Sequence, residues 1–427
     1  MKQRSNKDIF VIGFALFSMC FGAGNVIFPP YLGVGAGPSW LLGFLCYYLA
    51  DIGLALLALF SMFRKNGSQG IIEPIGKIPS TILMCAIVLC IGPMLAIPRT
   101  AATTFEMAVQ PLTSHVNAVV FSIIFFAIIF VLTVRETSVV DIVGKVLTPL
   151  LLVGLLILII KGIVTPLGDI SLTALESNVA ATGIKAGYQT MDVLATMLFG
   201  VLILKSTEDK GYTNPSEKSM VAFKSSLVAG FILLVIYGGL TYLGATVSAQ
   251  YDLSISRSAL VLAIVESLLG RAGTIIFAIV VALACITTAV GLVSSCSQYF
   301  SSLTRGKLKY SVLVGIICVF SAVASNVGLD QLISIAAPIL DIVYPPTLVL
   351  IALSFCKKLP VLVYRLGTVG ALVISVLTAV STYLHVPMKF LDILPMSSLG
   401  FGWVVPAVVC ALLGYGISRL GRTPEVA

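Results

Sequence analysis

The sequence has few charged residues. Only 10% of its 427 residues are Asp, Glu, Lys or Arg, whereas 58% are hydrophobic. Soluble domains carry about 25% charged residues, and the mean hydropathy of +1.09 lies far above their range. The shortage of charge excludes an ordinary soluble protein and predicts an all-α protein embedded in a lipid bilayer.

Histidine is scarce, and the usual enzyme motifs are missing. The chain has only two histidines, His115 and His385, and its nine cysteines show no CxxC spacing. It contains no GxSxG, HExxH or Walker motif, and no polar segment long enough for a nucleotide-binding domain. We therefore expect no enzyme, no cofactor and no histidine-based metal site.

Long apolar runs dominate the chain instead. A helix needs about 20 predominantly apolar residues to cross a bilayer, and we predict about twelve such transmembrane helices. The predicted runs are Ile9–Leu32, Ser39–Phe63, Thr81–Val109, Ala118–Val134, Ile142–Ile163, Tyr188–Leu204, Val221–Val247, Thr274–Ser301, Tyr310–Ser325, Leu332–Phe355, Leu366–Tyr383 and Phe401–Ile417.

The distribution of basic residues predicts the orientation. The net charge of +8 arises mainly from Lys and Arg in short loops, which indicates membrane topology and no nucleic-acid partner. If both termini are cytoplasmic, most of the 26 basic residues lie on the inner side. The outer loops are then Thr165 to Gly187, which is polar, and Tyr251 to Gly273. The second includes Ala259–Leu269, an apolar piece too short to cross, which we interpret as a lid or as a plain interfacial helix.

The first run contains a conspicuous interruption. Phe21, Gly22, Ala23, Gly24 and Asn25 bring two glycines and an asparagine into mid-membrane, and two prolines follow. A break here would free N–H groups of one half-helix for a substrate carboxylate and C=O groups of the other for a cation. The alternative is a proline-kinked helix with small residues at a helix contact.

The eighth run carries two adjacent threonines. Thr287 and Thr288 offer a cation two hydroxyl oxygens, and the carbonyl of Ala284 offers a third. Threonines in membrane helices also bond back to their own helix, which is the structural alternative.

Charged residues inside apolar runs are functional candidates. Four occur here, at Asp51, Arg99, Asp192 and Asp341. Arg99 and Asp192 lie at similar depth, so we predict that they pair, either as an outer gate or as a structural ion pair. Glu106 falls nearer the outer rim, where we expect it to be solvated.

Five segments together resemble one family. They are Phe21-Gly22-Ala23-Gly24-Asn25 with Phe28-Pro29-Pro30, Ile97-Pro98-Arg99-Thr100, Thr190-Met191-Asp192, Ala284-Cys285-Ile286-Thr287-Thr288-Ala289-Val290-Gly291 and Tyr344-Pro345-Pro346. With them the chain resembles the bacterial branched-chain amino acid:cation symporters over nearly its whole length.

The resemblance implies a leucine-transporter-like fold. That fold has a five-plus-five inverted repeat with broken helices 1 and 6 and two extra helices. The first repeat would span 9–163, the second 188–355, and the extra helices 366–417, all within one domain of 1–427. The sixth run has no proline or early glycine to mark its break.

The resemblance also implies the site residues. One cation would bind the carbonyls of Ser18 and Phe21 together with Ala284, Thr287 and Thr288, and a second would bind Cys20 and Asn25. Substrate contacts would come from the residues of the two breaks, with an apolar pocket for the side chain. The predicted substrate contacts are Phe21, Gly22, Ala23, Gly24, Asn25, Met191, Asp192, Leu194 and Phe199, and Val26 is a further pocket wall.

The expected function is import of leucine, isoleucine and valine with sodium or protons across a bacterial inner membrane. The alternatives are a carrier of the same fold for another small neutral amino acid or solute, an ion channel, or a membrane protein that transports nothing. The partners we expect are the amino acid and the lipid bilayer, and no obligate protein partner is evident.

Overall fold

A computed structural model describes residues 6–65, 67–113, 115–134, 148–356 and 359–421. Within these ranges the regular secondary structure is helical, and there is no β-strand. The principal helices are α1 (Asn6–Cys20), α2 (Ala23–Ala36), α3 (Trp40–Tyr48), α4 (Leu54–Lys65), α5 (Ser68–Ile72), α6 (Lys77–Leu89), α7 (Ala96–Thr104), α8 (Ala118–Val134), α10 (Thr148–Val164), α11 (Val179–Thr190), α12 (Asp192–Asp209), α13 (Pro215–Ala245), α14 (Arg257–Leu303), α15 (Tyr310–Ala324), α16 (Leu329–Leu353), α17 (Val361–Tyr383), α18 (Lys389–Asp392) and α19 (Val404–Gly421).

The helices are long and apolar enough to cross a bilayer, which confirms the predicted all-α membrane class. In the described residues, 8 helical stretches meet the length and hydropathy of a span, and Ala118–Val134, Thr148–Val164 and Val404–Leu420 are shorter apolar helices. Helical turns that join consecutive runs merge some spans, as in the 43-residue stretch Ala23–Lys65. The count of twelve, the inverted repeat and its boundaries stay predictions. The predicted start of the fifth run, Ile142, lies outside the described residues.

The first predicted run is divided into α1 and α2. The backbone leaves the helix at Phe21 and Gly22, and Gly22 is extended with φ −112° and ψ −163°. The interruption is shorter than predicted, because Ala23, Gly24 and Asn25 already form the first turn of α2. Pro29 and Pro30 lie inside that helix and do not end it.

The sixth predicted run is also broken, at a residue that no glycine or proline marks. Met191 separates α11 from α12 and adopts the left-handed conformation, with φ 71° and ψ 12°. Such a conformation is uncommon for residues other than glycine. Helix α11 begins at Val179, so the outer loop predicted to continue to Gly187 is shorter and ends in helix.

Two further helices bend where the sequence carries glycine. Gly92 interrupts the third run with φ −96° and ψ −129°, between α6 and α7. Gly270, at φ 64° and ψ −169°, kinks α14 and separates Arg257–Leu269 from the long remainder. The short segment predicted at Ala259–Leu269 is therefore helical and continuous with the eighth run across this kink.

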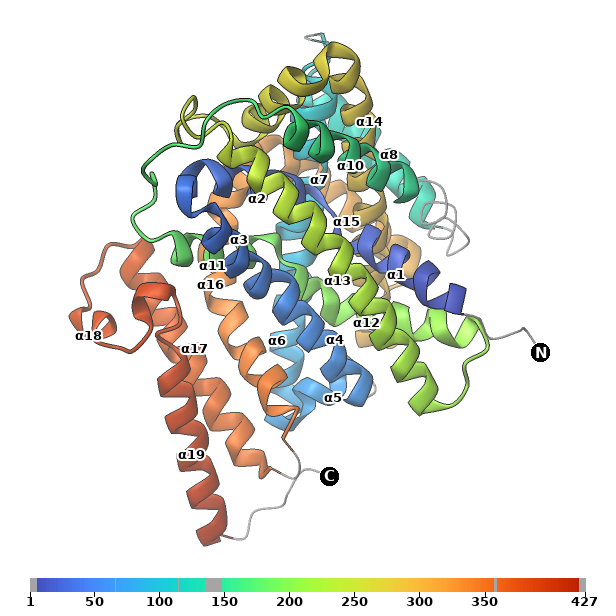
Figure 1. Cartoon of the computed structure of the whole chain (residues 1–427). Coiled ribbons are helices and arrows are strands. Elements are labelled where there is room, and N and C mark those ends of the chain that lie inside the picture. Colours follow the sequence, from blue (N-terminus) through green and yellow to red (C-terminus); the bar gives the residue numbers. More distant parts are fainter. Residues whose placement is uncertain (1–5, 66, 114, 135–147, 357–358, 422–427) are drawn as a thin grey trace.

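Glycines allow the broken helices to approach their neighbours closely. A Cβ atom on Gly244 of α13 would lie 1.9 Å from the carbonyl oxygen of Pro30 in α2. A Cβ on Gly187 of α11 would lie 2.8 Å from the carbonyl oxygen of Tyr47 in α3. Small residues at such contacts let helix backbones pack at short range in membranes. Away from this centre, α17 and α19 lie side by side at one edge of the molecule (Figure 1).

Candidate functional site

The two breaks share one small buried cavity. It has a volume of about 20 Å³, which is room for about one water molecule. Its walls come from α1, α2, α7, α12 and α14, so residues far apart in sequence converge there. The lining residues include Cys20, Gly22, Ala23, Asn25, Ile91, Arg99, Thr190, Met191, Asp192, Ala195, Phe199, Thr288 and Leu292.

The N-terminus of α2 forms one wall of this cavity. No side chain caps the helix at its N-cap residue Gly22, although the N–H of Gly22 donates to Asn25 Oδ1 at 3.3 Å. The first N–H groups of a helix have no partner within the helix. The first turn of α2 therefore presents backbone donors and the positive end of a helix dipole beside the cavity.

Asn25 links this first turn to two other helices. Its Nδ2 group donates to Asp192 Oδ2 at 2.7 Å and to the hydroxyl of Tyr237 in α13. Asn25, Asp192 and Tyr237 are all less than 5% exposed. The amide therefore joins the start of α2 to the start of α12, so the two breaks are directly connected.

Arg99 of α7 satisfies the end of α11. Its Nη1 donates to the carbonyl of Gln189 at 2.6 Å, and its Nη2 donates to the carbonyl of Thr190 at 3.0 Å. Arg99 is only 4% exposed. Among the residues that the structure describes, no carboxylate lies within 4.0 Å of its guanidinium. The predicted direct ion pair with Asp192 is therefore not formed in this conformation, because Arg99 binds backbone carbonyls.

Asp51 stands behind the second break. It lies in a π-helical turn, Leu49–Gly53, between α3 and α4, and is fully buried. Its Oδ1 accepts a hydrogen bond from Thr190 Oγ1 at 2.7 Å. The predicted intramembrane charges Asp51, Arg99 and Asp192 thus gather at the breaks. Asp341 lies in a separate cavity near the chain's C-terminal helices, where Tyr383 donates to it at 2.9 Å.

The predicted substrate residues divide into two groups. Gly22, Ala23, Asn25, Met191, Asp192 and Phe199 line the cavity, whereas Phe21, Gly24, Val26 and Leu194 are buried without lining it. Phe21 packs into an aromatic cluster, with ring centroids 5.6 Å from Phe17 and 6.2 Å from Tyr237. In this conformation Phe21 is thus part of the packing between α1 and α13 and not a wall of the cavity.

The threonines of α14 also differ from one another. Thr287 donates to the carbonyl of Ala284 at 2.8 Å, so two of the predicted cation ligands are bonded to each other. The Oγ1 of Thr288 is buried with no hydrogen-bond partner among the described residues. It lies against the first break, 3.2 Å from where a Cβ of Gly22 would stand. Ser18 and Cys20 are buried in the last turn of α1 nearby.

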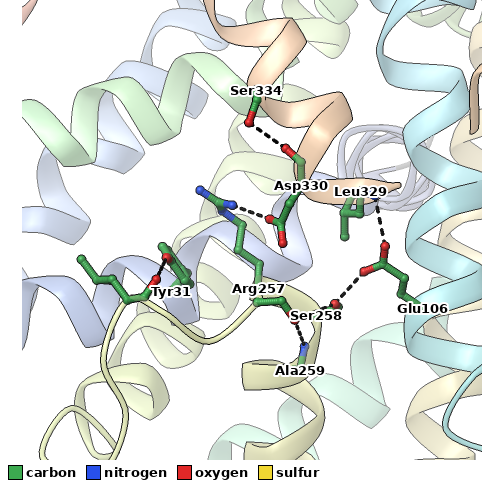
Figure 2. Close-up of polar contacts among 10 residues, drawn as sticks. Tyr31, Glu106, Arg257, Ser258, Ala259, Leu329, Asp330 and Ser334 are labelled. Atoms are coloured by element: carbon green, nitrogen blue, oxygen red, sulfur yellow. Dashed lines mark hydrogen bonds and ion pairs between the residues drawn. The ribbon is translucent and has the colours of Figure 1, made fainter. Parts of the chain in front are cut away.

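A second polar cluster lies on the side predicted to face outward (Figure 2). At the start of α14, Arg257 Nη1 lies 2.5 Å from Asp330 Oδ1 at the start of α16. The Arg257 guanidinium also stacks 4.5 Å from the ring centroid of Tyr31 and 5.9 Å from that of Phe28, both in α2. Arg99 lies 5.8 Å from the same Phe28 ring. The Phe28 side chain is therefore in contact range of one arginine of the outer cluster and of the arginine that lines the central cavity.

Glu106 belongs to this outer cluster, where it is partly buried and lines an open cavity. Its carboxylate accepts from Ser258 Oγ at 2.7 Å and from the N–H of Leu329 at 3.1 Å (Figure 2). It thereby joins the third run to the first turns of α14 and α16.

At the opposite end, Asp8 of α1 accepts from Lys210 and Tyr212, each at 3.2 Å.

Some site residues were missed because they carry no local signal. Tyr237 in the seventh run and the carbonyls of Gln189 and Thr190 look ordinary in the sequence. The break at Met191 lacks glycine and proline. The family resemblance predicted a broken sixth helix and included Thr190, Met191 and Asp192, but apart from the buried acid of Asp192 no local feature marked the position of the break.

Comparison with known proteins identifies relatives along the whole chain. The family described as "Branched-chain amino acid transport protein" matches residues 5–420. The branched-chain amino acid permease BraB of Bacillus subtilis is 35% identical over 96% of this chain and 95% of its own length. The permease BrnQ of Escherichia coli is 33% identical with the same coverage. The branched-chain amino acid transport system 3 carrier protein of Pseudomonas aeruginosa is 34% identical over the full length of both chains.

Solved transporters share the fold at low sequence identity. The inward-facing structure of Mhp1 has a TM-score of 0.62 and 12% identity, covering 96% of this chain and 91% of that one. A Na⁺-coupled sialic acid symporter in a substrate-bound, outward-open state has a TM-score of 0.59 and 13% identity, covering 98% and 91%. The chain is a transport protein and not an enzyme: it has a leucine-transporter-like fold and belongs to the branched-chain amino acid transport protein family.

Proposed function

We propose that this protein is a secondary active transporter that imports leucine, isoleucine and valine together with sodium ions or protons. The protein would work in a bacterial inner membrane with both termini in the cytoplasm. The observation that carries the proposal is the junction of two helix breaks at one buried polar cavity, in a chain whose relatives are named branched-chain amino acid permeases. Broken membrane helices that meet at mid-membrane are the binding device of many secondary transporters.

The substrate site lies at the start of α2. The uncapped N–H groups beside Gly22 are suited to the carboxylate of an amino acid. Met191, Ala195, Phe199, Ile91 and Leu292 line the same cavity and provide apolar walls for a branched side chain. An aliphatic pocket separates side chains that differ by one methylene only about 10- to 200-fold, so a carrier shared by three related amino acids is expected.

The cation site lies between the end of α1 and α14. The unpartnered hydroxyl of Thr288 and the carbonyls at the end of α1 provide hard oxygen ligands. Thr287 and Ala284 would join after their mutual hydrogen bond opens. The second position, at Cys20 and Asn25, is the weaker candidate because both ends of the Asn25 amide already have partners.

Transport requires the cavity to open. At about 20 Å³ it is too small for any amino acid, so α2, α7, α12 and α14 must separate to admit one. The ion pair between Arg257 and Asp330 would hold the outer side closed, and the contacts of Asp8 would hold the inner side. Alternating release of these two sets of contacts would expose the site to each side in turn.

Uptake into proteoliposomes tests the proposal. Purified protein should take up radiolabelled leucine saturably when a sodium or a proton gradient is imposed, and unlabelled isoleucine and valine should compete. Strong competition by a different neutral amino acid instead would favour the same-fold alternative. A current without saturable leucine uptake would indicate a channel and contradict the proposal.

Removal of the Thr288 hydroxyl tests the cation site. Thr288→Ala should raise the cation concentration for half-maximal leucine uptake at least about tenfold, which corresponds to the loss of roughly 1.4 kcal/mol of binding free energy. The matched control Thr288→Ser keeps the oxygen and should remain close to wild type. A cation response that is unchanged in Thr288→Ala would remove this residue from the cation site.

Neutralisation of Asp330 tests the outer closure. The side chains of Arg257 and Asp330 are 24% and 46% exposed, so their ion pair should contribute only about 0.5–1 kcal/mol. Asp330→Asn should therefore favour outward opening by about two- to fivefold. The measurement is the rate at which a membrane-impermeant maleimide labels Cys20 from outside, in protein that retains Cys20 alone.

The control for this experiment is Asp169→Asn, which neutralises an exposed acid of another outer loop. It should leave the labelling rate at the wild-type value. Equal rates for Asp330→Asn and wild type would show that the ion pair does not hold the outer side closed.

A further inference from the structure

The central cavity carries charges of both signs. Arg99 and Asp192 line it, and each is 4% exposed. Buried charges are expensive unless a partner compensates them. An apolar side-chain pocket and backbone N–H groups would suffice for a neutral passenger. The two buried charges therefore need an explanation beyond the helix breaks alone.

The charge of Arg99 is only partly compensated. Its two hydrogen bonds are to neutral carbonyls, at the end of α11. Its Nε group is buried and has no hydrogen-bond partner among the described residues. The guanidinium therefore keeps donor capacity for an anion, since arginine has five N–H donors and matches a carboxylate in bidentate geometry.

Arg99 also lies beside the start of α2. Its Nη2 stands 2.8 Å from where a Cβ of Gly24 would be placed, and its guanidinium faces the ring of Phe28 in the same helix. The positive end of the α2 dipole and the guanidinium thus meet at one wall of the cavity. Any side chain at Gly24 would displace the guanidinium from this position.

Asp192 lines the same cavity at the first position of α12. Its Oδ2 accepts a hydrogen bond from the Asn25 amide. The preceding Thr190 donates its hydroxyl to a second buried acid, Asp51. A carboxylate can accept several hydrogen bonds, so Asp192 can receive an ammonium group in addition to the Asn25 amide. The lining of the cavity therefore includes one cationic group, at Arg99, and one anionic group, at Asp192.

We propose that Arg99 and Asp192 form a receptor for the zwitterionic head group of an α-amino acid. Arg99 binds the substrate carboxylate together with the first turn of α2, and Asp192 binds the substrate ammonium group. This assignment rests on the proposed function, because it takes the passenger to be an amino acid. It adds that tight binding requires both the carboxylate and the ammonium group of the substrate. Branched aliphatic amines and branched carboxylic acids are then rejected even though their side chains fit.

The test measures binding to purified full-length protein by isothermal titration calorimetry. The ligands are leucine, 3-methylbutylamine, which lacks the carboxylate, and 4-methylpentanoate, which lacks the amine. Leucinamide serves as a fourth ligand because its carboxylate is neutralised. Wild-type protein should bind leucine about 100-fold or more tightly than each of the other three, since each leaves one buried charge without its partner.

Substitutions of Arg99 and of Asp192 separate the roles of the two residues in binding the substrate. Arg99→Gln should weaken leucine binding about 100-fold and leave binding of 3-methylbutylamine within threefold of wild type. Asp192→Asn, which keeps an oxygen for Asn25, should weaken leucine and 3-methylbutylamine and leave 4-methylpentanoate within threefold. Arg99→Lys retains the charge and should fall between wild type and Arg99→Gln.

Three outcomes would overturn the assignment. If Arg99→Gln weakens leucine and 3-methylbutylamine equally, Arg99 only ties α7 to α11. If wild-type protein binds leucinamide as tightly as leucine, no carboxylate receptor exists, and this result needs no variant to fold. If the variants bind leucine like wild type, neither charge contacts it. Failure of wild-type protein to bind any branched-chain amino acid is a different result, which would refute the proposed function itself.

Discussion

In a bilayer, every backbone N–H and C=O group that leaves a helix must find another partner, and the structure is organised around this constraint at two places. At the first break, the N–H of Gly22 donates to the carbonyl of Cys20 and to Asn25 Oδ1, and the Asn25 amide in turn donates to Asp192. At the second, Arg99 donates to the freed carbonyls of Gln189 and Thr190. The side chains that satisfy one break therefore also position the other. A substitution at either break should therefore alter the geometry of both breaks.

The same side chains connect the centre to the outer surface. The ring of Phe28 lies close to the guanidinium groups of both Arg99 and Arg257, and Arg257 is 2.5 Å from Asp330. A ligand that draws Arg99 toward the cavity would change the packing of Phe28, and with it the support for Arg257. This chain of contacts gives a physical route by which occupation of the centre can influence closure of the outer side. Each contact is individually weak, which suits a movement that must reverse in every transport cycle.

Composition and hydropathy were sufficient to predict the membrane class, and clustered glycine, asparagine and proline predicted the first break. These signals are local, so they could be found without knowledge of tertiary contacts. Met191 could not be found in this way, because no glycine, proline or asparagine marks its left-handed conformation in the sequence. The hydrogen-bond partners of buried side chains also depend on the tertiary structure and not on neighbouring residues in the sequence. The sequence suggested that Arg99 pairs with Asp192, whereas the fold brings the carbonyls of Gln189 and Thr190 to Arg99. It also gave no sign that Glu106 would bond to the starts of α14 and α16.

We propose that an amino acid completes the hydrogen bonding that the two breaks leave open. The most direct measurement is a cryo-electron microscopy map of the protein in a lipid nanodisc with leucine and the coupling cation. Density for leucine is expected between Gly22 and Met191, with its carboxylate on the first turn of α2. Leucine bound elsewhere, or density that traces the first and sixth runs as uninterrupted helices, would contradict it.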